Sequence, residues 1–297
     1  MRLLLFGGAG QVGTELRTLA LSQSVDVIAP TRSVVDLEDL DAIGRIMAAK
    51  PWSAVINAAG YTNVDRAESE EAAAFAINAK AAARLAAETG ARRIPFIHIS
   101  TDYVFDGRKG APYVEDDLAS PLNAYGRSKF AGEHAVRAAN PQHVILRTAW
   151  VHSPHGKNFV RTILRLAQER ECLTVVADQR GCPTAARDIA KACLDMALYC
   201  AAEPERAPYG IYHFAGAGEA SWFEFATAIV EVAADRLHRS PRMLPIRTID
   251  YPTPAVRPAD TRLDCGAIAH AFGVTLRPWR CGLAETIDRL LTSKEAP

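Results

Sequence analysis

Short apolar runs alternate with amphipathic stretches through the first half of the chain. The apolar runs have the length of buried strands, and the stretches between them repeat apolar residues at helical spacing. The predicted strands are 3–6, 25–29, 54–57, 96–100 and 144–148, and the predicted helices are 11–21, 39–49, 68–89 and 123–139. This alternation predicts an α/β fold, a doubly wound parallel sheet with helices on both faces.

The second half of the chain is less regular. We expect helices at 159–170 and 186–200, a strand at 211–214, and a helix from 222 to 237 opened by the capping box Ser221-Trp222-Phe223-Glu224. Prolines crowd 241–258, which predicts loops and short strands there. The change after about Trp150 predicts two domains. Residues 1–150 would bind a dinucleotide, 151–297 would form a smaller, mainly substrate-binding domain, and about 171–215 would return to the first domain.

Composition narrows the function classes. The chain has 297 residues, of which 49% are hydrophobic and 23% charged, and Lys+Arg and Asp+Glu both number 34. A balanced charge gives no support for binding nucleic acid, and no apolar run reaches membrane-spanning length. The six cysteines form no C-x-x-C pair, and the apolar N-terminus is too short for a signal sequence. We therefore expect a cytoplasmic globular protein with free thiols.

A glycine-rich turn follows the first predicted strand. The run Leu4–Gly13 places Gly7, Gly10 and Gly13 at three-residue spacing, between an apolar strand and a helix start. Phosphates need backbone N–H groups without obstructing side chains, together with the positive end of a helix. The turn therefore predicts a dinucleotide site, with the backbone of Gly10, Gln11 and Val12 facing the pyrophosphate.

The end of the second predicted strand indicates the cofactor. An acidic residue there would bind the ribose of NAD, but the chain has Thr31-Arg32. Arg32 could pair with the 2′-phosphate of NADP, which favours NADPH and leaves NADH as the alternative. We expect Asp36 and Leu37 to line the adenine, and Ala59-Gly60-Tyr61, after the third strand, to lie near the cofactor ribose.

Candidate catalytic residues come from one helix and one strand end. Tyr125 and Lys129 share a helical face at i, i+4, and Thr101 follows the fourth predicted strand. Since strand ends form the active-site edge of such a sheet, Thr101 is placed to hydrogen-bond a substrate carbonyl. Tyr125 would protonate the oxygen of a ketone, and the Lys129 ammonium would lower the pKa of Tyr125 and bind the nicotinamide ribose.

In these motifs the chain resembles the extended short-chain dehydrogenase/reductase superfamily, and within it most closely the dTDP-4-dehydrorhamnose reductase family. The resemblance covers nearly the whole chain. The matching segments include Leu4–Gly13, Asn57-Ala58-Ala59, Ser100–Phe105, Ser120–Asn123 before Tyr125, and Tyr251-Pro252-Thr253-Pro254.

The resemblance implies reduction of the 4-keto group of dTDP-4-dehydro-L-rhamnose to dTDP-L-rhamnose. It assigns catalysis to Tyr125, Lys129 and Thr101. The implied cofactor positions add Thr62 and Ile99 to those already named, with Tyr125 and Lys129 among them. The implied substrate positions are Thr101, Asp102, Tyr103, Trp150 and, for the diphosphate, Arg257 and Arg262.

One departure concerns metal. Some members of this family join as metal-linked dimers through clustered glutamates, and Glu15 fits that pattern. Arg187, however, stands where a glutamate is expected, and its positive charge would repel Mg²⁺. His152 and His155 lie in a predicted loop without further ligands. We therefore expect no metal site, and either a monomer or a homodimer.

Two other functions stay open. A nucleotide-sugar epimerase or dehydratase of the same superfamily is one, although dehydration often needs a glutamate after Thr101-Asp102, where this chain has Tyr103. The other is a non-catalytic regulatory subunit like that of methionine adenosyltransferase, which resembles this chain. An intact Thr101/Tyr125/Lys129 set argues against lost catalysis.

Overall fold

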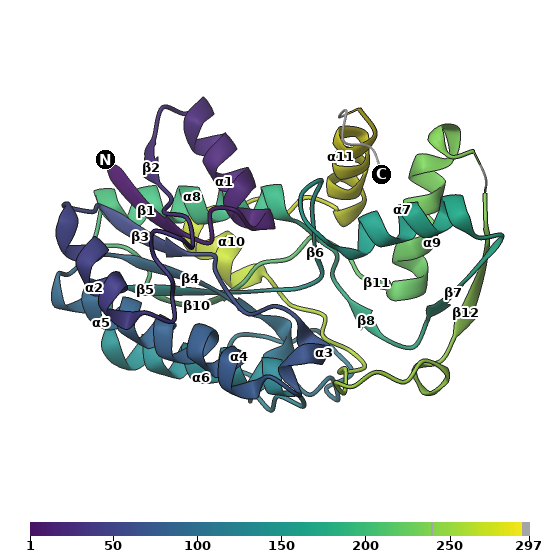
Figure 1. Cartoon of the computed structure of the whole chain (residues 1–297), viewed down its shortest axis with the longest axis horizontal. Helices are drawn as coiled ribbons and strands as arrows, with labels where there is room; N and C mark the ends of the chain where they lie inside the picture. The colour runs from purple at the N-terminus through teal and green to yellow at the C-terminus, as the bar shows by residue number, and fades with distance from the viewer. Residues whose placement is uncertain (239, 293–297) are drawn as a thin grey trace.

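Six parallel strands form the central sheet of the computed structural model, which describes residues 1–238 and 240–292 (Figure 1). Their order across the sheet is β10-β5-β4-β3-β1-β2. The strands are β1 (Arg2–Phe6), β2 (Asp26–Ile28), β3 (Ala54–Asn57), β4 (Phe96–Thr101), β5 (His143–Thr148) and β10 (Gly210–His213). Each strand begins and ends within one residue of its predicted bounds, because turns on both sides of a short apolar run limit where the strand can begin and end.

Helices cover both faces of this sheet, as expected for a doubly wound fold (Figure 1). Helices α1 (Gln11–Ser22) and α8 (Ala186–Ala202) lie on one face, and α2 (Leu40–Ala49), α5 (Ala82–Ala91) and α6 (Ala124–Ala139) on the other. Alternate residues of β1 enter opposite cores: Leu3 and Leu5 face one cluster, Leu4 and Phe6 the other. The fold class predicted from the sequence is confirmed.

The order of connection reverses between β1 and β3. The chain passes from β1 through α1 to β2 on one side, and then returns through α2 to β3 on the other side. The connections after the two strands therefore diverge and leave a crevice at their carboxyl ends. Ligands of open α/β sheets bind in such a crevice.

The helix predicted over 68–89 is not continuous. After α3 (Val64–Ala67), the chain forms α4 (Glu71–Phe75), a π-helical turn over Ala76–Ala81, and then α5. The neighbouring helix α6 approaches this turn closely, since a Cβ atom on Gly132 would lie 2.1 Å from the Asn78 carbonyl oxygen. Alanine periodicity predicts helix but does not distinguish α from π hydrogen bonding, so the sequence prediction was wrong there.

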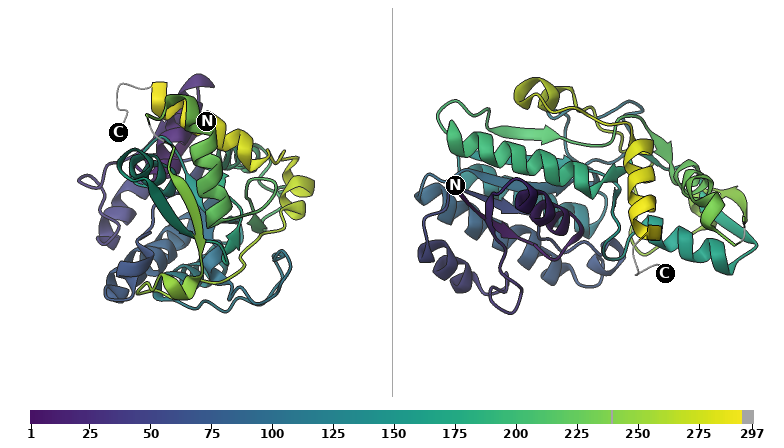
Figure 2. Two further views of the ribbon diagram at one scale, coloured as in Figure 1. Left: turned by 90° about the vertical axis from the view of Figure 1, so that its right-hand side faces the viewer. Right: turned by 90° about the horizontal axis from the view of Figure 1, so that it is seen from above.

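A smaller layer lies beyond the carboxyl edge of the sheet (Figures 1 and 2). Strand β7 (Cys172–Val176) pairs in parallel with β12 (Arg242–Ile246), and α7 (Phe159–Glu169) and α9 (Trp222–Ala233) pack against them. Short pairs β6 (Val151–His152)/β9 (Thr184–Ala185) and β8 (Arg180–Gly181)/β11 (Ala220–Ser221) lie between this layer and the sheet. Helix α11 (Trp279–Thr292) packs against α9 and β9. The sequence did not predict β7 or α11.

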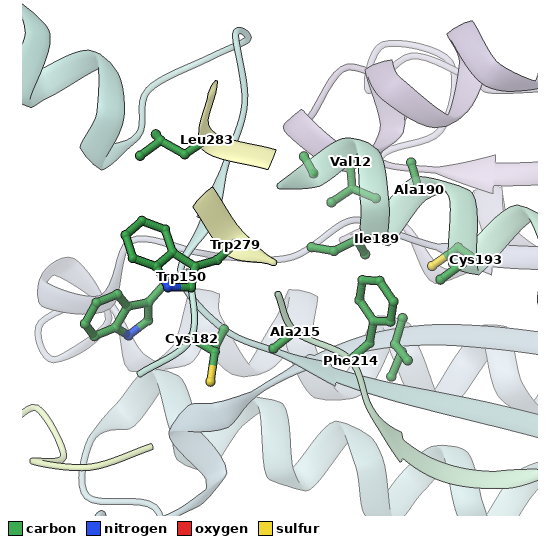
Figure 3. Packing of buried hydrophobic residues seen from close by; sticks show 14 of the residues in the cluster. Val12, Trp150, Cys182, Ile189, Ala190, Cys193, Phe214, Ala215, Trp279 and Leu283 are labelled. Atoms are coloured by element: carbon green, nitrogen blue, oxygen red, sulfur yellow. The ribbon is translucent and has the colours of Figure 1, made fainter. Parts of the chain in front are cut away.

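Part of the segment 171–215, which we expected to return to the first domain, lies in or against the main sheet. Helix α8 packs against α1, and β10 pairs with β5, with α10 (Gly266–Phe272) beside it. Strand β7 belongs instead to the smaller layer. Figure 3 shows Ile189 and Cys193 of α8 among Val12 and Phe214.

The predicted capping box at Ser221 and Glu224 is present, but α9 stops at Ala233 and a short 3-10 turn follows. Cys193 and Cys200 are core residues as expected, and all six cysteines are free thiols. Over residues 1–238 and 240–292, none of the helices has both the length and the apolar character needed to cross a membrane.

The contact between α6 and the π-helical turn generates a stability prediction. Gly132→Ala places a methyl group against a backbone oxygen, which cannot move aside, and should lower the free energy of unfolding by about 1–3 kcal/mol. The matched control is Gly44→Ala in α2, whose new methyl would meet the flexible side-chain ends of Arg84 and Glu88. The control should be neutral or gain up to about 1 kcal/mol. Urea unfolding measures both, and equal midpoints would contradict the prediction.

Candidate active site

Two adjoining cavities, of about 650 and 780 Å³, open at the point where the strand order reverses. Both are lined by the turn after β1 and the loop after β3, so they form one continuous crevice. Their sizes are those of ordinary ligand sites. The predicted residues lining the first cavity are Gly7, Gly10, Arg32, Asp36, Leu37, Ala59, Gly60, Tyr61 and Thr62. Those lining the second include Gln11, Val12, Ile99, Thr101, Asp102, Tyr103, Tyr125, Lys129 and Trp150.

The glycine turn has the geometry of a phosphate cradle. Gly7 has φ +82°, and a Cβ atom there would lie 2.5 Å from the Ala59 nitrogen. A Cβ atom on Gly13 would lie 2.1 Å from the Gly7 oxygen, so Gly13 shapes the turn without lining either cavity. Gly10 is the N-cap of α1 and presents no side chain. The first N–H groups of α1 therefore face the crevice and favour an anion.

Arg32 lies at the mouth of the first cavity. Its side chain is 76% exposed, and its guanidinium contacts Asp36 at 3.2 Å and Glu38 at 3.7 Å. The Glu38 backbone N–H, and secondly Arg32, lower the pKa of Asp36 despite some desolvation. The arginine is thus held near the cavity by two carboxylates, with its remaining donors in solvent.

Asn78 joins the loop after β3 to α6, and the sequence analysis missed it. Its Oδ1 accepts the Tyr61 N–H at 2.8 Å, and its Nδ2 donates to the Tyr61 oxygen at 3.0 Å and to Ser128 Oγ at 2.9 Å. Ser128 in turn donates to the Tyr125 carbonyl. The signal available in the sequence was an amide within an alanine-rich stretch, and the structure shows that Asn78 is buried.

Acidic residues hold the start of α6. Asn123 is the N-cap, and its Oδ1 accepts the Gly126 N–H at 2.8 Å. The Glu68 carboxylate accepts the Ala124 N–H at 2.7 Å, where negative charge complements the helix dipole. Glu71 pairs with Arg127 at 3.0 Å. These two glutamates, from the end of α3 and the start of α4, therefore fix the start of the helix that carries Tyr125.

Thr101, Tyr125 and Lys129 meet in the second cavity. Burial raises the pKa of Tyr125 to about 12, opposed by a hydrogen bond with Thr101. Burial lowers the pKa of Lys129 to about 8, opposed by the charge of Glu133. The Lys129 ammonium donates to the Ile99 carbonyl at 2.5 Å. The expected lowering of the Tyr125 pKa by Lys129 is therefore corrected, because desolvation dominates and raises that pKa.

Asp102 and Tyr103 surround these groups. Asp102 is 2% exposed, and burial raises the pKa of its carboxyl group to about 7, although it accepts hydrogen bonds from Thr261 at 2.5 Å and from Thr101 at 3.1 Å. The Tyr103 ring packs edge-on against Tyr125, with centroids 5.9 Å apart. The aromatic ring therefore occupies the position where a dehydratase would often carry a glutamate.

Trp150 has a strained backbone. Its φ is +45°, which is rare for a bulky residue and common at functional sites. A Cβ atom on Gly181 would lie 2.5 Å from its ring, and its other face stacks on Trp222 with centroids 3.6 Å apart. Trp222 also lines the second cavity, although the sequence indicated only its capping-box position. Figure 3 shows Trp150 and Trp279 within the same hydrophobic cluster.

The two arginines predicted to bind diphosphate lie outside the lining of both cavities. Arg257 forms a two-pronged pair with Asp65, at 3.1 and 2.9 Å. Arg262 pairs with Asp260 at 2.7 Å and with Glu219 at 2.5 Å. Carboxylates already occupy both guanidinium groups.

Two arginines and a histidine surround Glu15. Its carboxylate is fully buried and lies 2.8 Å from Arg289, 3.2 Å from His155 and 3.5 Å from Arg187. His152 instead packs against the Phe225 ring. No cluster of three or more His, Cys, Asp or Glu side chains suited to a metal occurs in the part of the chain that the structure describes.

A doubly wound sheet with a glycine turn at its reversal point defines a dinucleotide-binding fold of the Rossmann type. Comparison with known proteins narrows the class. The family model described as RmlD substrate binding domain matches residues 1–292. The dTDP-4-dehydrorhamnose reductase of Sinorhizobium fredii (strain NBRC 101917 / NGR234) is 42% identical over 279 residues, covering 94% of each chain.

Solved structures agree with this match. A dTDP-4-dehydrorhamnose reductase of Clostridium acetobutylicum superposes with a TM-score of 0.90 at 34% identity, covering 98% of this chain and 99% of that one. The enzyme of Bacillus anthracis, in complex with NADP, has a TM-score of 0.89 at 31% identity, covering 97% and 99%. The chain belongs to the dTDP-4-dehydrorhamnose reductase family.

Proposed function

We propose that the protein reduces the 4-keto group of dTDP-4-dehydro-L-rhamnose to give dTDP-L-rhamnose, with NADPH or NADH as the reductant. The observation that carries the proposal is the meeting of Thr101, Tyr125 and Lys129 in a cavity continuous with the glycine turn. Relatives named for this activity, and the NADP bound in the Bacillus anthracis structure, support it.

The crevice fits a dinucleotide by the chemistry of its lining. The N–H groups at Gly10, Gln11 and Val12 would hold the pyrophosphate, and Arg32 would hold a 2′-phosphate. Asp36 and Leu37 would contact the adenine part. Towards the other end, the contacts would come from Ala59, Gly60, Tyr61, Thr62, Ile99, Tyr125 and Lys129. A bound nicotinamide cofactor would supply the hydride.

Tyr125 would supply the proton to the substrate oxygen. Its pKa of about 12 keeps the phenol protonated at neutral pH, as a proton donor requires. Thr101 would hydrogen-bond the same carbonyl from the end of β4. Lys129, fixed by the Ile99 carbonyl, would bind the nicotinamide ribose with its ammonium.

The remaining substrate contacts follow from position. Asp102, Tyr103 and Trp150 line the cavity and would contact the sugar. Arg257 and Arg262 would reach the diphosphate only by sharing or exchanging their carboxylate partners. Residues 151–297 would supply most of this substrate-binding part, with α8 and β10 completing the dinucleotide-binding domain of 1–150. We place the protein in the cytoplasm, as a monomer or a homodimer.

A direct assay tests the proposed function. The enzymatically prepared 4-keto sugar nucleotide is mixed with the protein and NADPH or NADH, and both cofactor oxidation and product are followed. We expect cofactor consumption with formation of dTDP-L-rhamnose. A redox-neutral product would indicate an epimerase or dehydratase instead, and binding without turnover would indicate a regulatory subunit.

The role of Tyr125 is tested by Tyr125→Phe. Loss of the proton donor should lower kcat by at least about 100-fold while the dissociation constant for cofactor changes little. Tyr199→Phe is a matched control, because Tyr199 is an exposed residue of α8 outside both cavities. Retention of most activity in Tyr125→Phe would remove Tyr125 from the mechanism.

Cofactor preference depends on Arg32. Arg32→Ala should raise the KM for NADPH about tenfold, since a charge-assisted hydrogen bond to the 2′-phosphate is lost, and leave the KM for NADH nearly unchanged. Arg45→Ala, at an exposed arginine that lines neither cavity, serves as the control. An unchanged ratio of the two KM values in Arg32→Ala would exclude Arg32 as the determinant.

A further inference from the structure

We propose that Glu133 is a positioning residue, whose buried carboxylate fixes the strand end that carries Thr101 and lies behind the Lys129 ammonium on the same helical face. The inference rests on the proposed function, because Glu133 acts through residues that the proposed function makes catalytic. Its own side chain lines neither cavity.

Glu133 continues the row of catalytic residues along α6. Tyr125, Lys129 and Glu133 follow each other at intervals of four residues, so they share one helical face. Glu133 is 1% exposed, and its Oε1 accepts a hydrogen bond from Ser100 Oγ at 2.5 Å. Ser100 immediately precedes Thr101 on β4. The carboxylate therefore ties the end of β4 directly to the helix that carries Tyr125 and Lys129.

Arg147 completes the buried group from the next strand. It is 3% exposed, and its Nη2 and Nε lie 2.7 and 3.0 Å from Glu133 Oε2 and Oε1. Arg147 is paired in register with Ser100 across β4 and β5, and its guanidinium lies over the Phe105 ring. Glu133 thus contacts two adjacent strands at the same level, just beneath Thr101.

Stability alone is a weak explanation for burying the ion pair between Glu133 and Arg147. Taking both charges out of water is costly, and apolar side chains of similar volume often serve as well or better. The pair lies directly behind the proposed active site, and the carboxylate accepts a third donor, Ser100. A role for the charge in the site accounts for these features.

The charge acts on Lys129. Burial alone lowers the pKa of Lys129, and Glu133 opposes that shift, leaving it at about 8. The other ionisable groups around this site are Tyr125 on the same helix, His98 on β4, Asp102 just after β4, and Arg147 on β5, which pairs with Glu133. Burial keeps Tyr125 protonated and neutral, and lowers the pKa of His98 so far that its imidazole is neutral as well. Glu133 is therefore the carboxylate that opposes the effect of burial on the Lys129 pKa.

Glu133→Gln in the full chain tests the inference, because the amide keeps an acceptor for Ser100 and removes only the charge. The alkaline limb of kcat/KM reports the free enzyme. Without the carboxylate, Lys129 loses its proton at lower pH, so this limb should move to lower pH by about one unit or more. Asp188→Asn is the matched control. Asp188, on α8, is a partly buried carboxylate paired with Arg277, and its removal should leave the limb in place.

A second variant tests the inference in case Glu133→Gln does not fold. Glu133→Gln leaves the Arg147 charge buried without its partner, whereas Glu133→Gln with Arg147→Met removes both charges. The double variant should still move the alkaline limb to lower pH, but by less than Glu133→Gln, because it also removes the Arg147 cation. A folded variant of either kind with the wild-type midpoint would overturn the role of Glu133. Absence of turnover in the wild-type chain would overturn the proposed function instead, and the pH dependence of cofactor affinity would then still test Glu133.

Discussion

The backbone of Gly7 lies so close to that of Ala58 and Ala59 that no methyl group fits between them. This contact brings the carboxyl ends of β1 and β3 together where the strand order reverses. Because the connections after the two strands leave in opposite directions, the contact also forms the floor of the crevice. The N-terminus of α1 and the loop carrying Gly60 and Tyr61 take their positions from it, and both cavities open on it.

The other wall of the crevice is fixed from α6. Glu68 holds the helix start, the Asn78–Ser128 contact ties the helix to the loop after β3, and Glu133 ties it to the strand end at Ser100. Each contact joins two elements that line the crevice. Tyr125 and Lys129 are therefore positioned by polar contacts distributed along α6. The absence of a side chain at Gly132 also lets α6 pack closely against the backbone of Asn78.

The sequence predicted the parts whose physics is local. Apolar runs located the strands, and the glycine spacing and the Tyr125/Lys129 interval located residues that the structure brings together. It missed features that depend on distant contacts. The π-helical turn around Asn78 arises from packing against α6, and β7 acquires its partner 242–246 only through the fold. Arg257 and Arg262 show no sign in the sequence of the carboxylates that occupy them, since Asp65 and Glu219 lie far along the chain.

Desolvation shifts the pKa values of the two ionisable groups at the centre of the proposed site. Burial moves both ionisable groups toward their neutral forms, raising the pKa of Tyr125 to about 12 and lowering that of Lys129 to about 8. A tyrosine that gives up a proton during ketone reduction must first hold it, and the raised pKa ensures this at neutral pH. A tyrosine acting as a base in the reverse reaction would need the opposite shift. Tyr125 is therefore protonated before a ketone is reduced, and the Glu133 carboxylate, one helical turn beyond Lys129, opposes the lowering of the Lys129 pKa by burial.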